Sequence, residues 1–267
     1  MGVDFFAGII IFVFGAVIGS FLNVVILRLN TGQSTISGRS KCFTCAKKLK
    51  WHELLPIISF VLLKGKCSAC KTKISWQYPL VETITGIIFV LLFQQSQISN
   101  LKSQNFFDFG FLVLIFSILI IIAIYDYHHQ IIPNFFVWIF NGLAFLWLFN
   151  FGNLSAIWRI ENFNMDGFLA GFILFAFFAL LWGVSKGRWM GFGDVKLALG
   201  IGWLLGMAKG AAAITLAFWI GAIAGVLLIY LSKNKYGLKS SIAFGPFMIL
   251  GTAISFFWGE KIISFLF

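Results

Sequence analysis

Long apolar segments dominate this chain of 267 residues and limit what it can fold into. Hydrophobic residues make up 60% of the sequence and charged residues only 11%, outside the range of soluble domains. Runs able to cross roughly 30 Å of hydrocarbon recur along the whole chain. We expect about eight spans, at residues 5–27, 80–93, 107–125, 131–149, 168–184, 195–207, 211–231 and 244–258. The sequence therefore predicts an all-α polytopic membrane protein.

Basic residues indicate how these spans are oriented. The segment 29–79 between the first two spans is rich in lysine and arginine, so the positive-inside rule places it in the cytoplasm and the N-terminus outside. With eight spans, the 20 basic residues divide into 16 inside and 4 outside. Attraction to an anionic leaflet explains the net charge of +11, so no nucleic-acid partner is expected. The lipid bilayer is the expected surroundings.

Two aspartates lie at the edges of apolar runs. Asp126 ends the third run and Asp194, in Gly191-Phe-Gly-Asp194, begins the sixth. The predicted topology puts both at the cytoplasmic boundary, where an ionisable group usually pairs, lines a cavity or carries chemistry. Two carboxylates that meet can perform general acid and base catalysis on a peptide bond. We therefore predict an intramembrane aspartic protease with Asp126 and Asp194 as its catalytic pair.

Two other classes of function use the same residues. In a membrane transporter or proton-relay protein, Asp126 and Asp194 would pass protons, although transport sites usually lie near the bilayer midplane. In a non-enzymatic adaptor, the loop between the first two spans would bind a partner, and the aspartates would only cap helices. That second interpretation gains weight if one aspartate proves dispensable.

All four cysteines lie in this loop. Cys42-Phe-Thr-Cys45 and Cys67-Ser-Ala-Cys70 are separated by 21 residues. Two such pairs supply four thiolates for one tetrahedral Zn²⁺, as in zinc ribbons. One alternative is a pair of disulfides, which a reducing cytoplasm disfavours, and a weaker one is lone redox thiols. The sequence predicts a structural zinc site at Cys42, Cys45, Cys67 and Cys70 in a small cytoplasmic, zinc-ribbon-like loop domain.

Several separated motifs together resemble the bacterial type IV prepilin peptidases over nearly the whole chain. The first is Gly-Ser-Phe-Leu-Asn-Val-Val-Ile-Leu-Arg-Leu at residues 19–29, and the second is the paired Cys-x-x-Cys arrangement. The others are Leu55-Pro-Ile-Ile-Ser59, Gly65-Lys-Cys67, Tyr78-Pro-Leu-Val-Glu82, Asp126 with Ile132-Pro-Asn134, Gly191-Phe-Gly-Asp-Val-Lys-Leu197 and Phe244-Gly-Pro-Phe247. Gln77 and Asn134 depart from residues common in the family, but neither touches the proposed aspartate pair.

The resemblance implies an activity and a location. Members cleave a short leader from prepilins or pseudopilins at the cytoplasmic face, and many then N-methylate the new N-terminus with S-adenosylmethionine. It implies a multi-pass protein of the bacterial inner membrane and carries the catalytic role over to Asp126 and Asp194. Residues 1–28 would be the first transmembrane helix, 29–79 the zinc-binding, methyltransferase-associated loop domain, and 80–267 a seven-helix peptidase domain. No residues that bind S-adenosylmethionine are implied. Glu82, at the start of the second span, is either a helix-start carboxylate favoured by the helix dipole or part of the methyl-transfer site.

Overall fold

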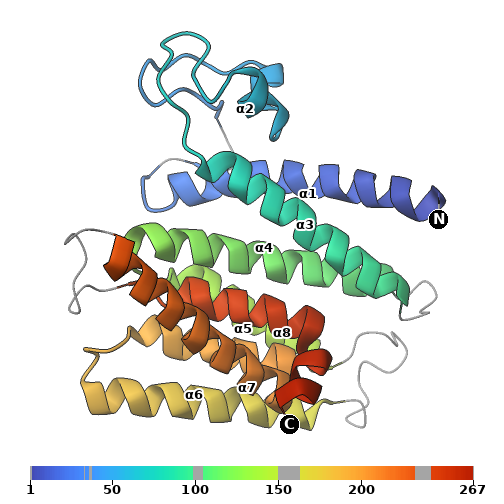
Figure 1. Cartoon of the computed structure of the whole chain (residues 1–267), viewed down its shortest axis with the longest axis vertical. Helices are drawn as coiled ribbons and strands as arrows, with labels where there is room; N and C mark the ends of the chain where they lie inside the picture. Colours follow the sequence, from blue (N-terminus) through green and yellow to red (C-terminus); the bar gives the residue numbers. More distant parts are fainter. Residues whose placement is uncertain are drawn as a thin grey trace. The chain divides into compact units, whose positions relative to one another are not determined.

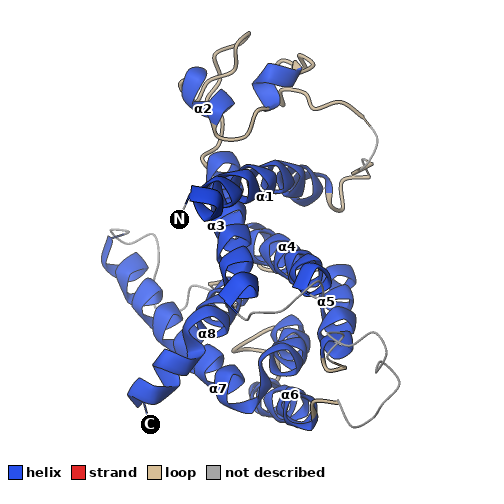
Figure 2. Ribbon diagram, turned by 90° about the vertical axis from the view of Figure 1, so that its right-hand side faces the viewer, coloured by secondary structure: helices blue, strands red, loops and turns tan. Residues whose placement is uncertain are grey.

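The computed structural model describes residues 2–32, 34–35, 38–98, 105–149, 163–231 and 242–266. In these ranges the chain is helical and contains no β-strand (Figure 2), which confirms the predicted all-α fold class. The elements are α1 (Gly2–Arg28), the 3₁₀ helix η1 (Trp51–Leu54), α2 (Ile58–Leu62), α3 (Gln77–Ile98), α4 (Asn105–His129), α5 (Asn134–Trp147), α6 (Met165–Ser185), α7 (Phe192–Leu231) and α8 (Gly245–Leu266) (Figure 1).

Of the helices described, six are long and apolar enough to cross a membrane, namely α1, α3, α4, α6, α7 and α8. The predicted fourth span, 131–149, corresponds to α5, which has only 14 residues. Helix α5 begins after Pro133, whose backbone is extended (φ −70°, ψ 117°). Proline has no backbone N–H to donate within a helix, so the helix does not include the residues before it.

The predicted charge partition includes basic residues that lie outside the described residues, namely Lys102, Arg159, Lys233, Lys235 and Lys239.

Helix α7 contains both the sixth and the seventh predicted spans. Its 40 residues are interrupted at Gly206, where φ is 77° and ψ is −176°, a backbone conformation favoured by glycine. Directly after the break, the N–H of Met207 donates to Oδ2 of Asp166 on α6 at 2.9 Å. This carboxylate satisfies a backbone donor that the interruption frees, so α7 forms two helical segments in place of one.

The chain divides into two compact units. The first contains residues 1–102 and 112–121, and the second contains 103–111 and 122–267. In the first unit, α1 and α3 pack backbone to backbone through glycines (Figure 1). A Cβ added at Gly15 would lie 2.8 Å from Cα of Gly86, and one at Gly19 would lie 2.8 Å from Cα of Glu82. Such small residues let transmembrane helices approach closely.

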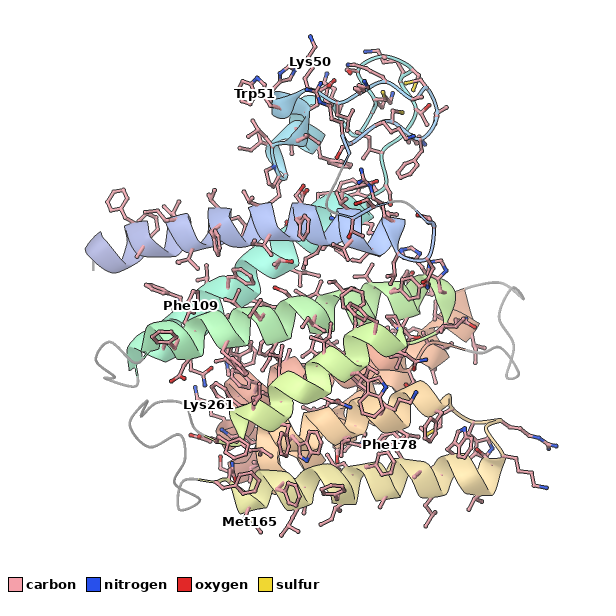
Figure 3. All side chains as sticks on the ribbon, turned by 180° about the vertical axis from the view of Figure 1, so that it is seen from behind. Lys50, Trp51, Phe109, Met165, Phe178 and Lys261 are labelled. Carbon is pink, nitrogen blue, oxygen red and sulfur yellow. The ribbon has the colours of Figure 1, made fainter. Side chains whose placement is uncertain are left out.

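The second unit is held together around α7, which packs against α5, α6 and α8. A Cβ added at Gly202 of α7 would lie 2.5 Å from Cα of Gly171 on α6. Phe178, labelled in Figure 3, is on the same helix as Gly171. It is fully buried and stacks on Phe218 of α7 with ring centroids 6.2 Å apart. Phe244, just before α8, lies 5.0 Å from the Phe218 ring. This aromatic cluster fixes the start of α8 against α6 and α7.

Candidate active site and metal centre

The four cysteines converge on one point, as the sequence predicts. All lie within the described residues, all are free thiols, and their Sγ atoms lie within 4.8 Å of one another. Sγ of Cys42 is 3.8 Å from Sγ of Cys70, too far for a disulfide. Four sulfur atoms about 2.3 Å from a tetrahedral metal ion lie roughly 3.8 Å apart. The cluster therefore has the donor set and the spacing to hold a metal ion.

The two Cys-x-x-Cys segments repeat one backbone geometry. In the first, the N–H of Cys42 donates to the carbonyl of Lys47 at 3.0 Å, and the N–H of Ala46 donates to the carbonyl of Cys42 at 3.0 Å. In the second, Cys67 N–H donates to the Thr72 carbonyl at 2.8 Å, and Lys71 N–H to the Cys67 carbonyl at 3.1 Å. Ala46 (φ 55°) and Lys71 (φ 58°) both have a positive φ. Each segment is thus a tight knuckle that turns both of its thiols to one side.

A buried carboxylate joins the two knuckles. Oε1 of Glu53 in η1 accepts from Nζ of Lys47 at 2.8 Å and from the hydroxyl of Ser68, while Oε2 accepts from the N–H of Lys50 at 2.8 Å. The Lys47 ammonium, with these other two donors, lowers the pKa of Glu53 to about 2. Glu53 is therefore an anion that holds the first knuckle to the second.

The thiols themselves favour a bound cation. The Thr72 hydroxyl, 3.3 Å from Sγ of Cys70, and the Thr72 N–H lower the pKa of Cys70 to about 6. At Cys45 the Lys47 N–H favours the thiolate, but desolvation and the three neighbouring cysteines outweigh it and raise the pKa to about 11. Four thiolates this close repel one another, and a metal cation between them would remove that repulsion.

Asp126 lies near the end of α4 and is 4% exposed. Its Oδ2 accepts a hydrogen bond of 3.1 Å from the N–H of Gly245, the first residue of α8. A helix start presents unpaired N–H groups and the positive end of the helix dipole, so it suits a carboxylate. Only glycine fits this approach, because a Cβ at position 245 would lie 2.6 Å from Oδ2 of Asp126.

Asp194 lies in the first turn of α7 and is 7% exposed. Its Oδ2 accepts from the N–H of Gly191 at 3.2 Å, and its own N–H donates to the Gly191 carbonyl at 3.2 Å. The first of these bonds is the carboxylate half of a capping box, and the second closes the first turn of the backbone. Asp194 thus stabilises the start of α7 and is fixed in position by the same contacts.

Ile132 connects the surroundings of the two aspartates. A Cβ added at Gly193 would lie 2.8 Å from Cβ of Ile132, and one at Gly245 would lie 3.3 Å from its Cδ1. The residues beside Asp194 and Asp126 therefore pack against the same side chain, and the two carboxylates are close enough to interact electrostatically. The structure brings the two predicted site residues together, from helices α4 and α7, in one buried setting.

The sequence motifs contain positions whose part in the site becomes visible only in the structure. Gly245 and Ile132 belong to motifs quoted above, yet nothing in those motifs says that both approach the aspartates. For Gly245 the signal in the sequence is a Gly-Pro pair that opens a helix, since proline suits the first turn and glycine permits close contact.

Lys196 donates to Oδ1 of Asn134 at 2.8 Å, and its Nζ lies 5.2 Å from the centre of the Phe192 ring. These contacts join α7 to α5.

Fold and site define a class: a multi-pass membrane protein with two buried aspartates at helix ends and a four-cysteine module between its first two long helices. Residues 13–96 match the bacterial peptidase A24 N-terminal domain, and residues 113–226 match the type IV leader peptidase family. The chain belongs to the type IV leader peptidase family, which confirms the resemblance that its motifs indicate.

Full-length relatives agree with this assignment. A protein of Bacillus subtilis named prepilin leader peptidase/N-methyltransferase is 32% identical over 256 residues, with 96% of each chain covered. Proteins of the same name from Stutzerimonas stutzeri and Pseudomonas aeruginosa are each 28% identical, over 94% and 93% of this chain and 91% and 89% of their own. No solved structure matches the chain.

Proposed function

We propose that this protein is an aspartic endopeptidase that removes the leader of prepilin-like substrates, with Asp126 and Asp194 as its catalytic pair. The names of its relatives supply the reaction and the substrate class. The observation that supports the choice of residues is the shared packing of Gly193 and Gly245 on Ile132, which places two buried carboxylates in one setting.

The chemistry follows from two carboxylates held close together. Two like charges at short distance cannot both ionise cheaply, so the pair shares one proton. The ionised aspartate takes a proton from a water molecule as that water attacks the scissile carbonyl. The protonated aspartate donates a hydrogen bond to the carbonyl oxygen and stabilises the charge that develops there. Hydrogen bonds from Gly245 and Gly191 to Oδ2 of each aspartate hold both carboxylates in place.

The site faces the cytoplasm in this proposal, and the N-terminus lies outside. The excess of lysine and arginine in the segment 29–79 supports this orientation through the positive-inside rule. A prepilin-like substrate carries a basic leader followed by an apolar helix, so its scissile bond would reach the membrane boundary where the aspartates lie. Residues 29–79 would form the zinc-binding domain, and residues 80–267 the peptidase domain.

The protein would also N-methylate the amine that cleavage exposes, as the names of its relatives state for them. S-adenosylmethionine, when bound, supplies an electrophilic methyl group. The amine nitrogen accepts that methyl group and sheds one proton, and S-adenosylhomocysteine is left. The four cysteines would hold a structural Zn²⁺, since the sulfur spacing suits tetrahedral zinc and no fourth ligand position remains for catalysis.

A cleavage assay with a chelator tests the peptidase assignment. Purified protein in detergent should cut a prepilin-like substrate at the same rate before and after brief treatment with a metal chelator, because the aspartate pair needs no metal. Cleavage is followed by the mass of the released leader. A loss of cleavage that added zinc restores would instead make the metal part of the proteolytic site.

Substitution of Gly245 tests how closely Asp126 must be positioned. In Gly245→Ala the new Cβ would press on Oδ2 of Asp126, so the carboxylate must shift away from the N–H that holds it. Displacements of about 1 Å at a catalytic group can cost roughly a hundredfold in rate, and we expect a loss of that order in cleavage. Gly142→Ala is the matched control, because its Cβ would meet nothing within 4 Å. Equal rates for the two variants would contradict this role.

A further inference from the structure

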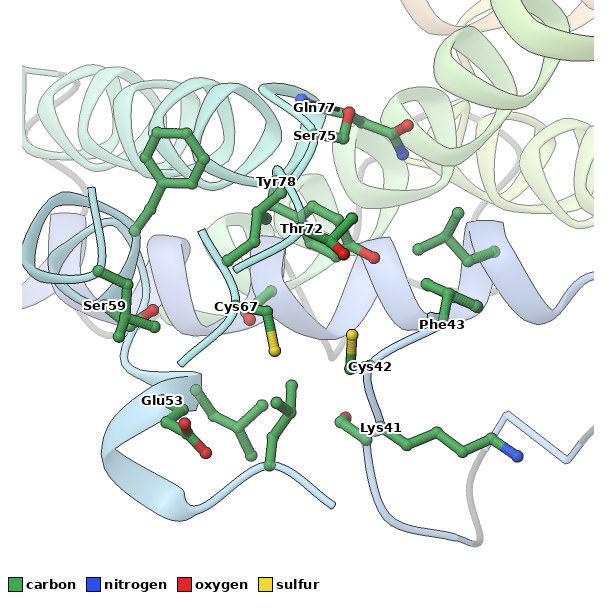
Figure 4. Close-up of a pocket in the computed structure, with 18 of the residues that line it drawn as sticks. Lys41, Cys42, Phe43, Glu53, Ser59, Cys67, Thr72, Ser75, Gln77 and Tyr78 are labelled. Carbon is green, nitrogen blue, oxygen red and sulfur yellow. Dashed lines mark hydrogen bonds between the residues drawn. The ribbon is translucent and has the colours of Figure 1, made fainter. Parts of the chain in front are cut away.

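A cavity of about 420 Å³ lies between the four-cysteine module and the adjoining ends of α1 and α3, entirely within the first unit (Figure 4). This volume is in the range of sites for small organic ligands and cofactors. The module contributes Cys42, Phe43 and Phe60 to its lining, while α1 contributes Ser20, and α3 contributes Tyr78 and Glu82. Cys42 is a proposed zinc ligand, so the cavity shares a wall with the metal centre.

Glu82 places an acidic side chain on this wall. It is 6% exposed, its Oε2 accepts from the N–H of Ile57 at 2.7 Å, and the Ser20 hydroxyl also hydrogen-bonds to it. No lysine or arginine of the described residues forms an ion pair with it. A carboxylate this deeply buried is costly without a cation nearby, and a cationic ligand in the cavity would supply one.

The same carboxylate also has a structural task. Ile57 has φ 61° and ψ −51°, a strained conformation for a β-branched residue, and its N–H is the group that Glu82 binds. This task needs a hydrogen-bond acceptor and no charge. A glutamine at position 82 keeps an acceptor for Ile57 and removes the charge, so the two roles can be separated by experiment.

The rest of the lining suits the other parts of one ligand. The rings of Phe43, Phe60 and Tyr78 offer flat faces to a heteroaromatic base and to a cation. Lys41 and Lys73 also line the cavity, and both are exposed. Together the lining offers aromatic faces, one buried carboxyl group and exposed cations. A ligand that has a purine base, a positive centre and a carboxylate would match all three.

We propose that this cavity binds S-adenosylmethionine and that the Glu82 carboxylate is the counter-charge of its sulfonium group. The inference rests on the proposed N-methyltransferase function and adds the place and the basis of recognition. Because Cys42 and Cys67 both line the cavity, loss of the metal would deform the binding site. Glu82 acts here as a binding residue, through its charge.

Three ligands measure the contribution of that charge. S-adenosylmethionine carries a sulfonium, sinefungin an ammonium at the corresponding place, and S-adenosylhomocysteine a neutral sulfur. Binding of each is measured by calorimetry on the zinc-loaded full chain in detergent. The wild-type protein should favour the two cations. A hydrogen bond or ion pair with a charged group contributes about tenfold to a hundredfold in affinity. Glu82→Gln should therefore lower the affinity for the two cationic ligands by that factor and leave the affinity for S-adenosylhomocysteine nearly unchanged.

Two further variants separate recognition from folding. Glu260→Gln removes one carboxylate from the exposed pair with Lys209 and should leave all three affinities unchanged. Phe43→Ala removes a ring that is 76% exposed, so the protein should still fold. This substitution should lower the affinity for all three ligands by about threefold to tenfold. Zinc content and thermal unfolding without ligand should match the wild type in every variant.

The outcomes distinguish the site from the function. If the wild-type protein binds none of the three ligands, both the methyltransferase assignment and this site are overturned. If it binds S-adenosylmethionine but Glu82→Gln keeps the preference for cations, the site alone is overturned. A Glu82→Gln protein that loses zinc, or that weakens all three ligands equally, would make Glu82 a purely structural residue and also overturn the proposal, as would unchanged binding in Phe43→Ala.

Discussion

Asp126→Asn and Asp194→Asn should each reduce leader cleavage to background, a loss of roughly a hundredfold or more. Asparagine keeps an acceptor for the N–H of Gly245 or Gly191, so the hydrogen bond that positions each side chain survives. What disappears is the carboxyl group that exchanges a proton. Each variant thus removes one half of a pair that works only as a unit. Cleavage of a prepilin-like substrate by membranes containing each variant measures the effect.

Asp108→Asn is the matched control, since it changes a carboxylate in the first turn of the same helix, α4. Expression, membrane insertion and zinc content should be the same in all three variants. Appreciable cleavage by either Asp126→Asn or Asp194→Asn would refute the mechanism. It would leave the aspartates as helix caps, the role that the hydrogen bond between Asp194 and Gly191 already shows to be available.

Replacing Cys42 or Cys70 by serine should remove the bound metal and unfold the module. Purified wild-type protein should carry about one zinc per chain, as expected for four thiolates in one structural site. The module contains short helices and tight knuckles but little core of its own, so much of its folding free energy must come from metal binding. Metal analysis and the protease sensitivity of the module report both effects.

Methylation should fall much further than cleavage in these cysteine variants. The proposed aspartate pair belongs to the second unit, whereas the four cysteines belong to the first. A freshly reduced wild-type protein without zinc would contradict the metal assignment. Equal loss of methylation and cleavage would indicate that the module positions the substrate for the aspartates. A cysteine variant that binds zinc and methylates normally would remove the cluster from the mechanism.

The sequence predicts the helices well because in lipid every apolar span must satisfy its own backbone. It predicts two spans where α7 lies but not the backbone break at Gly206, since that break depends on Asp166, which lies on another helix. The cysteine cluster follows from spacing alone. The sequence does not single out Glu53, because only the fold of both knuckles brings its partners, Lys47 and Ser68, to it.

The candidate site divides in the same way. Asp126 and Asp194 are conspicuous in the sequence because carboxylates are rare beside apolar runs. The surroundings of the two aspartates cannot be predicted from the sequence. Gly245 contacts Asp126 although 119 positions separate them, and Ile132 packs against Gly193 and Gly245 from different helices. The cavity near Glu82 depends on contacts between two helices and a loop, which no local pattern in the chain specifies.

The most direct test of the central claim is the N-terminus of a processed substrate. The chain is co-expressed with a prepilin-like protein of its own genome, and the substrate's N-terminal peptide is analysed by mass spectrometry. We expect removal of the basic leader just before the apolar helix, and one added methyl group on the new amine. Both changes should be absent with Asp126→Asn. An intact leader in the presence of the wild-type protein, for every such substrate, would contradict the account.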